Sequence, residues 1–177
     1  GLGYDPDEAR QLLARAGYQG GRGFSTVDLL TFRALEPQIE YLLAQWQEIL
    51  GVEITWETME YGMFLDRMGK KLPHMFLSGW TADYPDPDNF LRASPVRRYT
   101  RWQSRDYDGL VEKARRCTDQ GERMILYRQA DRILVEEAAI MPLVYMRLHL
   151  LVKPWVRKLP TSGIKHWFWK DAIIEPH

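Results

Sequence analysis

Carboxylates are concentrated in one short stretch of this sequence, residues 79–91, which reads GWTADYPDPDNFL. The acidic and aromatic side chains that could do chemistry there are Asp83, Asp86, Asp88, Trp80 and Tyr84. Side chains of these types could coordinate a metal ion, transfer protons in hydrolysis, or bind a cationic ligand. Two prolines fix their own φ angles and favour extended residues before them, so the stretch predicts a rigid loop. A purely structural connector is the alternative interpretation.

A metal site is the first of these chemistries that the spacing argues against. A calcium loop needs a flexible glycine turn and a later bidentate glutamate, and the two prolines remove donors and freedom here. The four histidines are scattered without i, i+4 spacing, and no cysteine lies beside any of them: His74, His149, His166 and His177. A first-row metal cage needs such clustering. We therefore expect neither a metal nor another cofactor.

Acid–base hydrolysis stays open at this point. A glycosidase needs one carboxyl group in an apolar setting and a second that stays ionised, and Trp80 and Tyr84 could provide the apolar setting. The same aromatic residues would equally suit a bound sugar or amine. Nucleophilic catalysis is less favoured, because the sequence has no G-x-S-x-G or phosphate-binding motif. The single cysteine, Cys117, lies on the apolar stripe of a predicted helix, where we expect it to be inert.

Composition sets broad limits on the class of protein. The chain has 177 residues, of which 45% are hydrophobic, and its 24 basic and 24 acidic residues give a net charge of zero. This is ordinary globular material with no electrostatic signature of nucleic acid or of an anionic membrane surface. No apolar run reaches the roughly 18 residues that a spanning helix needs. The start at Gly1, without Met and directly before a helix signal, suggests a piece of a longer chain.

The elements before the acidic stretch alternate between helix and strand. Capping and apolar spacing predict helices at residues 6–16, 37–50 and 61–68, the first with a buried stripe of Ala9, Leu12, Leu13 and Ala16. Strands are predicted at residues 26–32, 52–58 and 74–78. Short connections favour right-handed βαβ units and therefore an α/β fold with a mainly parallel sheet. The acidic loop follows the third strand, at the carboxyl edge where such sheets bind ligands.

The second half of the chain predicts helices and then a change in character. We expect a helix at residues 107–117, a longer one opened by the Asp119–Glu122 capping box and reaching Ala138, and a strand at residues 140–145. From residue 148 onward, Lys, Pro and aromatic residues dominate, including three of the seven tryptophans. Aromatic clusters of this kind mark contact surfaces. A structural or interaction module with this tail as its working surface is therefore a further hypothesis.

The residues quoted above resemble a known family. The block from Gly79-Trp80 through Ala82-Asp83-Tyr84-Pro85-Asp86-Pro87-Asp88-Asn89-Phe90-Leu91 is similar to the signature of the family 5 extracellular solute-binding proteins, the peptide- and nickel-binding components of ABC importers. Other matches follow in order along nearly the whole chain: Tyr4 to Leu13, Ala16-Gly17-Tyr18, Gly51-Val52, Glu122-Arg123, Glu136-Glu137, Pro142-Leu143 and Lys153-Pro154-Trp155-Val156. Family members are much longer, so the resemblance is to their C-terminal portion.

The resemblance implies a type II periplasmic-binding-protein architecture of two lobes that close on a ligand. Residues 1–147 would form most of the second lobe, and residues 148–177 a returning tail that packs on, or crosses to, the missing first lobe. The implied function is non-catalytic capture of short peptides, or a related small solute, for delivery to the permease of an ABC importer. The implied location is periplasmic or extracellular, with tethering as a lipoprotein compatible with it.

The resemblance also implies which residues bind. Asp83 would pair with the α-amino group of a peptide, Trp80 would form a pocket wall, and Ala82 would be small enough for the ligand to approach. Neighbouring backbone would add strand-like hydrogen bonds, so the implied ligand-binding set is Trp80, Thr81, Ala82, Asp83 and Tyr84. A partner for a ligand carboxylate is not assigned, because solvated surface is the favoured interpretation of Arg92, Arg97, Arg98 and Arg101. Peptides, nickel chelates, oligosaccharides and opines remain open as ligands.

Overall fold

The computed structural model describes residues 3–32, 36–94, 99–147, 149–159 and 169–177. The chain forms two compact units, Gly3–Gly79 and Trp80–His177, and each is described by itself below. Among the described residues, none of the helices combines the length and apolar character needed to cross a bilayer. The expected division into a lobe and a tail at residue 148 stays a prediction.

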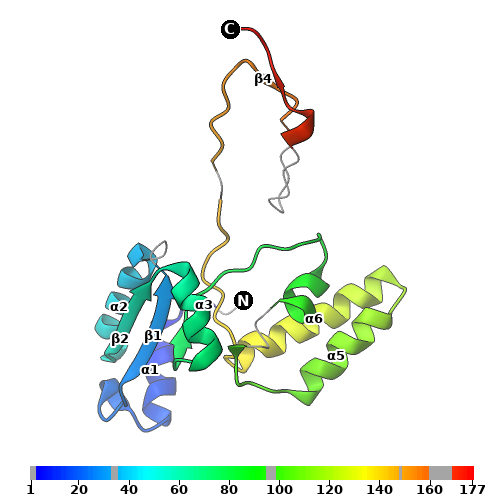
Figure 1. Cartoon of the computed structure of the whole chain (residues 1–177). Helices are drawn as coiled ribbons and strands as arrows, with labels where there is room; N and C mark the ends of the chain where they lie inside the picture. The colour runs from blue at the N-terminus through cyan, green and yellow to red at the C-terminus, as the bar shows by residue number, and fades with distance from the viewer. Residues whose placement is uncertain (1–2, 33–35, 95–98, 148, 160–168) are drawn as a thin grey trace. The chain divides into compact units, whose positions relative to one another are not determined.

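The first unit is built on a small parallel sheet (Figure 1). Its strands β1 (Val27–Phe32), β2 (Ile54–Met59) and β3 (Met75–Phe76) lie in the order β2-β1-β3 and pair in parallel, with Leu29 of β1 opposite Trp56 and Met75. Helices α2 (Glu36–Leu50) and α3 (Tyr61–Lys70) make the crossovers. The prediction of βαβ units with a parallel sheet is confirmed.

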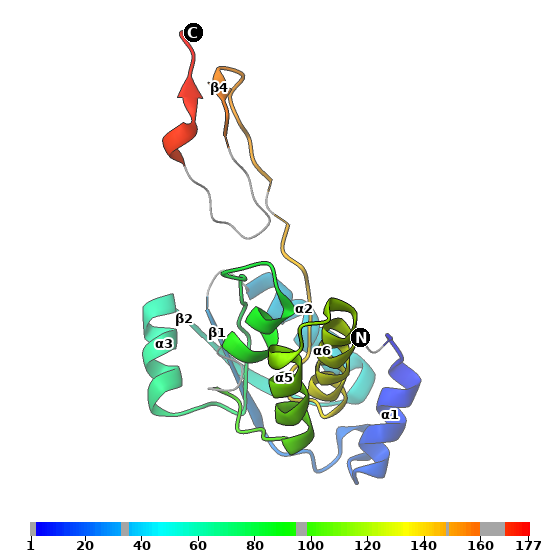
Figure 2. The ribbon, with the colours of Figure 1, turned by 90° about the vertical axis from the view of Figure 1, so that its right-hand side faces the viewer.

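The central strand explains why this sheet is stable. Leu29, Leu30 and Thr31 of β1 are all buried, as expected of a parallel strand with helices on both faces. Helices α2 and α3 lie on opposite faces of the sheet (Figure 1, Figure 2). On the α3 side, Phe64 packs edge-to-face against Phe32, with ring centroids 5.5 Å apart.

Helix α1 (Pro6–Arg15) begins as its sequence predicts, because the Asp5 side chain accepts a hydrogen bond from the Glu8 N–H (2.9 Å). Gly17 ends the helical region with φ +94°, a conformation that favours glycine. The predicted buried stripe is wrong, because no residue of the helix is fully buried: Ala9 and Leu13 are half-buried, Leu12 is 55% exposed and Ala16 is exposed. The helix packs against α2 and the turn at Gln19–Gly21, and these contacts leave that side of it in solvent.

The second unit contains a helical hairpin of α5 (Arg105–Arg116) and α6 (Gln120–Glu136). Both helices begin at side-chain caps: the Ser104 hydroxyl accepts from the Tyr107 N–H, and Asp119 accepts from the Glu122 N–H (2.7 Å), the second of which was predicted. Their shared core also holds Leu91 of the short π-helix η3 (Asn89–Ala93) and consists of Leu91, Tyr107, Val111, Ala114, Leu126, Tyr127, Ala130 and Leu134. Cys117 packs at the edge of this core, in line with an inert thiol.

The predicted strand at residues 140–145 is absent from the part of the chain that the structure describes. Residues 140–145 form neither a strand nor a helix, and Tyr145 is fully exposed. A strand persists only when a neighbouring strand satisfies its peptide groups, and Pro142 removes one donor. Further on, β4 (Val156–Arg157) pairs antiparallel with β5 (Ile173–Ile174), and Trp155 stacks on His177. Trp167 and Phe168 of the predicted aromatic cluster lie outside the described residues.

Candidate functional site

The acidic loop, residues 80–94, is shaped by short-range backbone bonds. The Asp86 N–H donates to the Tyr84 carbonyl (2.9 Å), and the Asn89 N–H donates to the Asp86 carbonyl (3.0 Å). The Asp86 side chain accepts from the Asp88 N–H (2.8 Å) and so caps the turn that leads into η3. Asp86 therefore shapes the turn, whereas the Asp88 side chain makes no capping hydrogen bond to the helix and binds other side chains instead.

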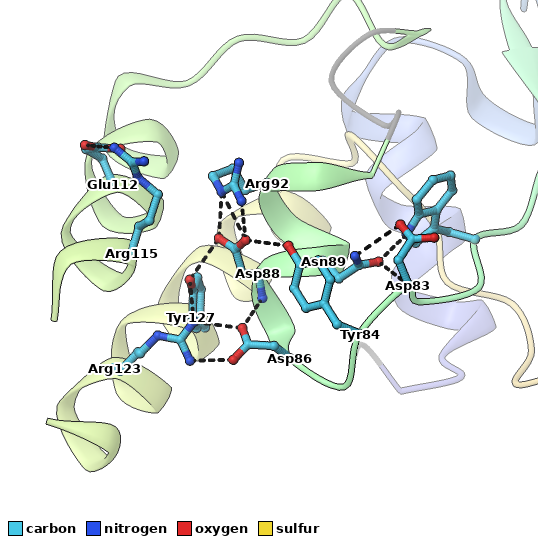
Figure 3. A network of polar contacts seen from close by, with 11 residues as sticks. Asp83, Tyr84, Asp86, Asp88, Asn89, Arg92, Glu112, Arg115, Arg123 and Tyr127 are labelled. Atoms are coloured by element: carbon cyan, nitrogen blue, oxygen red, sulfur yellow. Dashed lines mark hydrogen bonds and ion pairs between the residues drawn. The ribbon is translucent and has the colours of Figure 1, made fainter. Parts of the chain in front are cut away.

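Asn89 is the centre of the first group of side-chain contacts (Figure 3). It is completely buried, and its Oδ1 accepts hydrogen bonds from the Trp80 indole Nε1–H (2.7 Å) and from the Asp83 backbone N–H (3.2 Å). Its Nδ2 donates to Oδ2 of Asp83 (3.3 Å). One buried amide thus binds both the indole and the carboxylate that the sequence singles out.

Asp88 is the centre of the second group. Its carboxylate is almost fully buried and accepts a bifurcated hydrogen bond from the Arg92 Nε–H (2.8 Å to Oδ1 and 3.1 Å to Oδ2) and a second bond from Nη2 (2.5 Å to Oδ2). The Tyr84 hydroxyl donates to Oδ2 (2.8 Å), and the Tyr127 hydroxyl, which comes from α6, donates to Oδ1 (3.1 Å). A buried carboxylate requires partners of this number, because an unpaired buried charge is strongly destabilising.

An ion pair fastens the loop to helix α6. The Arg123 guanidinium reaches both oxygens of Asp86, with Nη1 to Oδ2 at 2.6 Å and Nη2 to Oδ1 at 2.8 Å. Arg123 also donates to the Tyr127 hydroxyl (3.3 Å) and lies over the Tyr127 ring. Both side chains of the pair are mostly buried, so it is less screened by water than a surface pair.

These contacts shift the proton affinities of the groups involved. The hydrogen bond from Arg92 holds the pKa of Asp88 below its usual range, and that from Arg123 does the same for Asp86, in both cases against the opposing effect of burial. Burial, and then its bond to Asp88, raises the pKa of the Tyr127 phenol. Both carboxylates are therefore firmly ionised at neutral pH, whereas a general acid in hydrolysis needs a raised pKa. This arrangement gives no support to a glycosidase site at Asp86 and Asp88.

The predicted ligand-binding residues have unequal positions in the loop. The Asp83 carboxylate is exposed to solvent and Trp80 is 39% exposed, so both are accessible. Thr81 and Tyr84 are also exposed, although Tyr84 is tied to Asp88 through its hydroxyl. Ala82, in contrast, is buried.

Basic and metal-ligating residues complete the inventory of the site. Arg92 is used by Asp88, Arg101 is exposed, and Arg97 and Arg98 lie outside the described residues. Within the described ranges, no group of three or more His, Cys, Asp or Glu side chains is arranged to hold a metal ion.

Sequence reasoning missed three residues of this network: Asn89, Arg123 and Tyr127. Asn89 follows Asp88 at the start of η3, where a short polar residue is common for local reasons alone. Arg123 follows the capping box, and Tyr127 lies on the apolar stripe of α6. Their partners are 37 and 39 residues away in the chain, and no local pattern reports such a contact.

Comparisons with known proteins agree with this fold. Residues 2–96 match the family described as bacterial extracellular solute-binding proteins, family 5, middle. The chain is 33% identical to di/tripeptide-binding protein 1 of Pseudomonas aeruginosa (strain UCBPP-PA14), covering 90% of this chain and 31% of the relative. It is 29% identical to the periplasmic oligopeptide-binding protein OppA of Escherichia coli (strain K12), covering 85% of this chain and 28% of the relative.

Solved structures give the same result for the architecture. The chain is similar to the murein tripeptide binding protein MppA of Escherichia coli, with a TM-score of 0.87 at 23% identity, covering 97% of this chain and 35% of that protein. It is also similar to the periplasmic binding protein DppA of Helicobacter pylori in complex with the peptide STSA, with a TM-score of 0.65 at 32% identity, covering 77% and 28% of the two chains. The predicted α/β fold is confirmed. The chain spans about a third of the length of these proteins.

Proposed function

The chain belongs to the family 5 bacterial extracellular solute-binding proteins, and from this premise we propose that it forms the second, ligand-binding lobe of a receptor that delivers short peptides to an ABC importer. The relatives named above are binding proteins for di- and tripeptides, oligopeptides or a murein tripeptide. The proposed activity is capture and release without chemical change of the ligand.

One observation carries this proposal: the three loop aspartates differ in their partners. Asp86 is paired with Arg123 and Asp88 with Arg92, whereas the described residues offer Asp83 no basic partner. Asp83 is nevertheless held in place beside the Trp80 indole through Asn89. An exposed, oriented carboxylate next to an aromatic side chain suits an ammonium group, which it can bind by a charge-assisted hydrogen bond with the ring nearby.

We assign each predicted site residue a role on this basis. Asp83 accepts the α-amino group of the peptide, Trp80 forms the wall beside it, and the backbone of Thr81 and Tyr84 adds strand-like hydrogen bonds. Ala82 is buried, so its role is to let the loop pack closely behind these groups rather than to touch ligand with its side chain.

The rest of the protein completes the proposed receptor. Residues 1–147 form most of the second lobe, and residues 148–177 form a returning tail that packs on, or crosses to, the first lobe. The permease subunits of the importer are the proposed partners. The proposed location is the periplasm or the cell exterior, where the relatives described as periplasmic also reside.

Calorimetry on the full-length protein tests the proposed substrate class. Di- and tripeptides with free amino termini should give saturable heats, while neutral oligosaccharides and nickel chelates should give none. Binding of only an oligosaccharide or only a nickel chelate would overturn the peptide assignment. Turnover of a chromogenic glycoside that is lost in Asp83→Asn or Asp86→Asn would instead support a carbohydrate-active enzyme.

A further inference from the structure

The orientation of the Asn89 amide is determined by its surroundings. Its Oδ1 receives two donors, the indole N–H of Trp80 and the backbone N–H of Asp83. Rotating the amide by 180° would place its NH₂ group against both donors, so only one orientation satisfies the hydrogen bonds. The amide nitrogen must then face Asp83 Oδ2, to which it donates at 3.3 Å.

This orientation binds Asp83 at two points. The same amide accepts from the main-chain N–H of Asp83 and donates to its carboxylate, which restricts both the backbone and the side-chain torsions of that residue. One carboxylate oxygen is thereby occupied, and within the described residues Oδ1 of Asp83 has no hydrogen-bond partner. A carboxylate fixed in this way meets an incoming cation with little further loss of conformational freedom.

The chemical type of residue 89 matters as much as its position. Asn89 is fully buried and neutral, whereas an aspartate there would place a second carboxylate within about 3 Å of Asp83. Two carboxylates so close do not both ionise readily, and one pKa rises strongly. The amide Nδ2 of Asn89 donates a hydrogen bond to Asp83, which an ionised carboxylate at this position could not do. Because the amide is neutral, Asp83 carries the only charge of this pair.

We propose that Asn89 is the positioning residue of the ligand site, holding the Asp83 carboxylate and the Trp80 indole in the relative geometry that selects a free amino group. This inference rests on the proposed function, because it assumes that the ligand carries an ammonium. Asn89 itself does not contact the ligand. Its role is separate from that of the contacts with α6, which reach the loop through Asp86 and Asp88.

The experiment compares trialanine with N-acetyl-trialanine on the full-length protein by calorimetry. In Asn89→Leu, which has nearly the same volume and no polar atoms, the preference for the free amine should fall by about tenfold or more, the order expected for losing one charge-assisted contact. In the control Tyr127→Phe, which removes a hydrogen bond from α6 to Asp88 and leaves the contacts of Asn89 intact, the preference should stay within about twofold of wild type.

A second variant gives a readout that loss of stability would not produce. Asn89→Asp keeps the two acceptor contacts and replaces only the donor, so the loop should keep its shape. The indole N–H resonance of Trp80, assigned with Trp80→Phe, should stay near its wild-type position in Asn89→Asp and shift in Asn89→Leu. The affinity of Asn89→Asp for trialanine should fall at least about fivefold from pH 7 to pH 5 relative to wild type, because the carboxylate pair takes up a proton. The other loop carboxylates, Asp86 and Asp88, are paired with arginines in both wild type and Asn89→Asp. Their titration should therefore contribute equally to the pH response of the two proteins.

The possible outcomes separate the two proposals. If wild type does not bind trialanine, or binds it and the acetylated peptide equally, the proposed function fails. If wild type prefers the free amine and Asn89→Leu keeps that preference, the role of Asn89 is wrong while the function stands. The role of Asn89 would also be wrong if the affinity of Asn89→Asp for trialanine did not change with pH relative to wild type and the Trp80 resonance did not move in Asn89→Leu. Asn89 would then act only in packing.

Discussion

The acidic loop and the apolar segment, residues 140–147 and 149–152, differ in where their contacts come from. Every buried acid of the loop is satisfied by side chains of its own unit, and Asp88 alone has three such partners. The apolar segment has no pairing strand among the described residues, and it exposes Tyr145 and Leu151 completely. The buried acids of the loop are satisfied within its own unit. The apolar segment, in contrast, has the composition of a buried strand, yet most of its side chains are exposed.

The apolar segment is the part of the chain that needs a partner. Large apolar side chains side by side in solvent are unfavourable and mark a surface that something covers. The exposed members of the segment are Met141, Leu143, Val144, Tyr145, Met146, Leu150, Leu151 and Val152. On the proposed architecture their cover is the first lobe, and the loop needs no such help to hold its side chains in place.

Leu151→Ser in the full-length protein should have the largest effect on this comparison. If the first lobe covers the segment, losing a buried leucine there lowers the free energy of unfolding by about 3 kcal/mol. Leu151→Met, which conserves volume, should lower it by less than about 1.5 kcal/mol. Urea unfolding measures both. A loss below about 0.5 kcal/mol in the serine variant would mean that the segment stays in water.

Arg123→Gln tests whether the loop is held by its own unit. The change leaves the mostly buried Asp86 without its partner and should lower the free energy of unfolding by about 2 kcal/mol. The matched control is Arg132→Gln on the same helix, which breaks an exposed pair with Glu136 and should have an effect within about 0.5 kcal/mol. Equal effects of the two variants in denaturant unfolding would contradict a special role for the Asp86–Arg123 pair.

Tyr127→Phe should have a smaller effect than Arg123→Gln. It removes one of the three hydrogen-bonding partners of the buried Asp88 and should lower the free energy of unfolding by about 1 kcal/mol. Tyr84→Phe, at a partly exposed position on the same carboxylate, should lower it by about half as much. Thermal unfolding of both variants checks this order, and a reversed order would show that burial does not govern the strength of these bonds.

Acid should weaken the loop by the smallest amount. The folded-state pKa values of Asp86 and Asp88 lie below those of the unfolded chain, so their contribution to stability is present above about pH 4 and is lost as pH falls through the folded-state pKa values. Asp86→Asn removes the share that comes from Asp86. Between pH 6 and pH 3 the variant should therefore lose less stability than wild type, by a difference of up to about 1 kcal/mol. Urea unfolding at the two pH values measures the difference, and identical losses in the two proteins would contradict the ion pair.

The same contrast explains what the sequence could predict. Capping residues and apolar periodicity are local signals, and they placed α1, α2, α5 and α6 within about two residues of their ends. The parallel sheet followed from the alternation of elements. The predicted strand at residues 140–145 failed because a strand depends on a neighbour, and residue pattern reports only the tendency to become one.

The candidate site was predictable to a similar depth. The acidic loop was located from its residue types, whereas Asp83 as a ligand contact came from the family resemblance and stays a prediction. The partners of Asp86 and Asp88 on α6 did not, because the sequence does not state which arginine of a helix meets which acid of a distant loop. Asn89 was part of the motif that the sequence analysis quoted, but no role was predicted for it. Its hydrogen bonds to Trp80 and Asp83 form where it lies buried in the π-helical turn η3.

The most direct test of Asp83 as the amine anchor is a calorimetric cycle of two proteins and two ligands. Trialanine and N-acetyl-trialanine are titrated into full-length wild type and Asp83→Asn at neutral pH. Wild type should prefer the free amine by roughly tenfold to a hundredfold, the range expected for a hydrogen bond between charged groups, and Asp83→Asn should bind the two ligands with nearly equal affinity. An unchanged preference in Asp83→Asn would contradict the assignment and move the amine anchor to another residue.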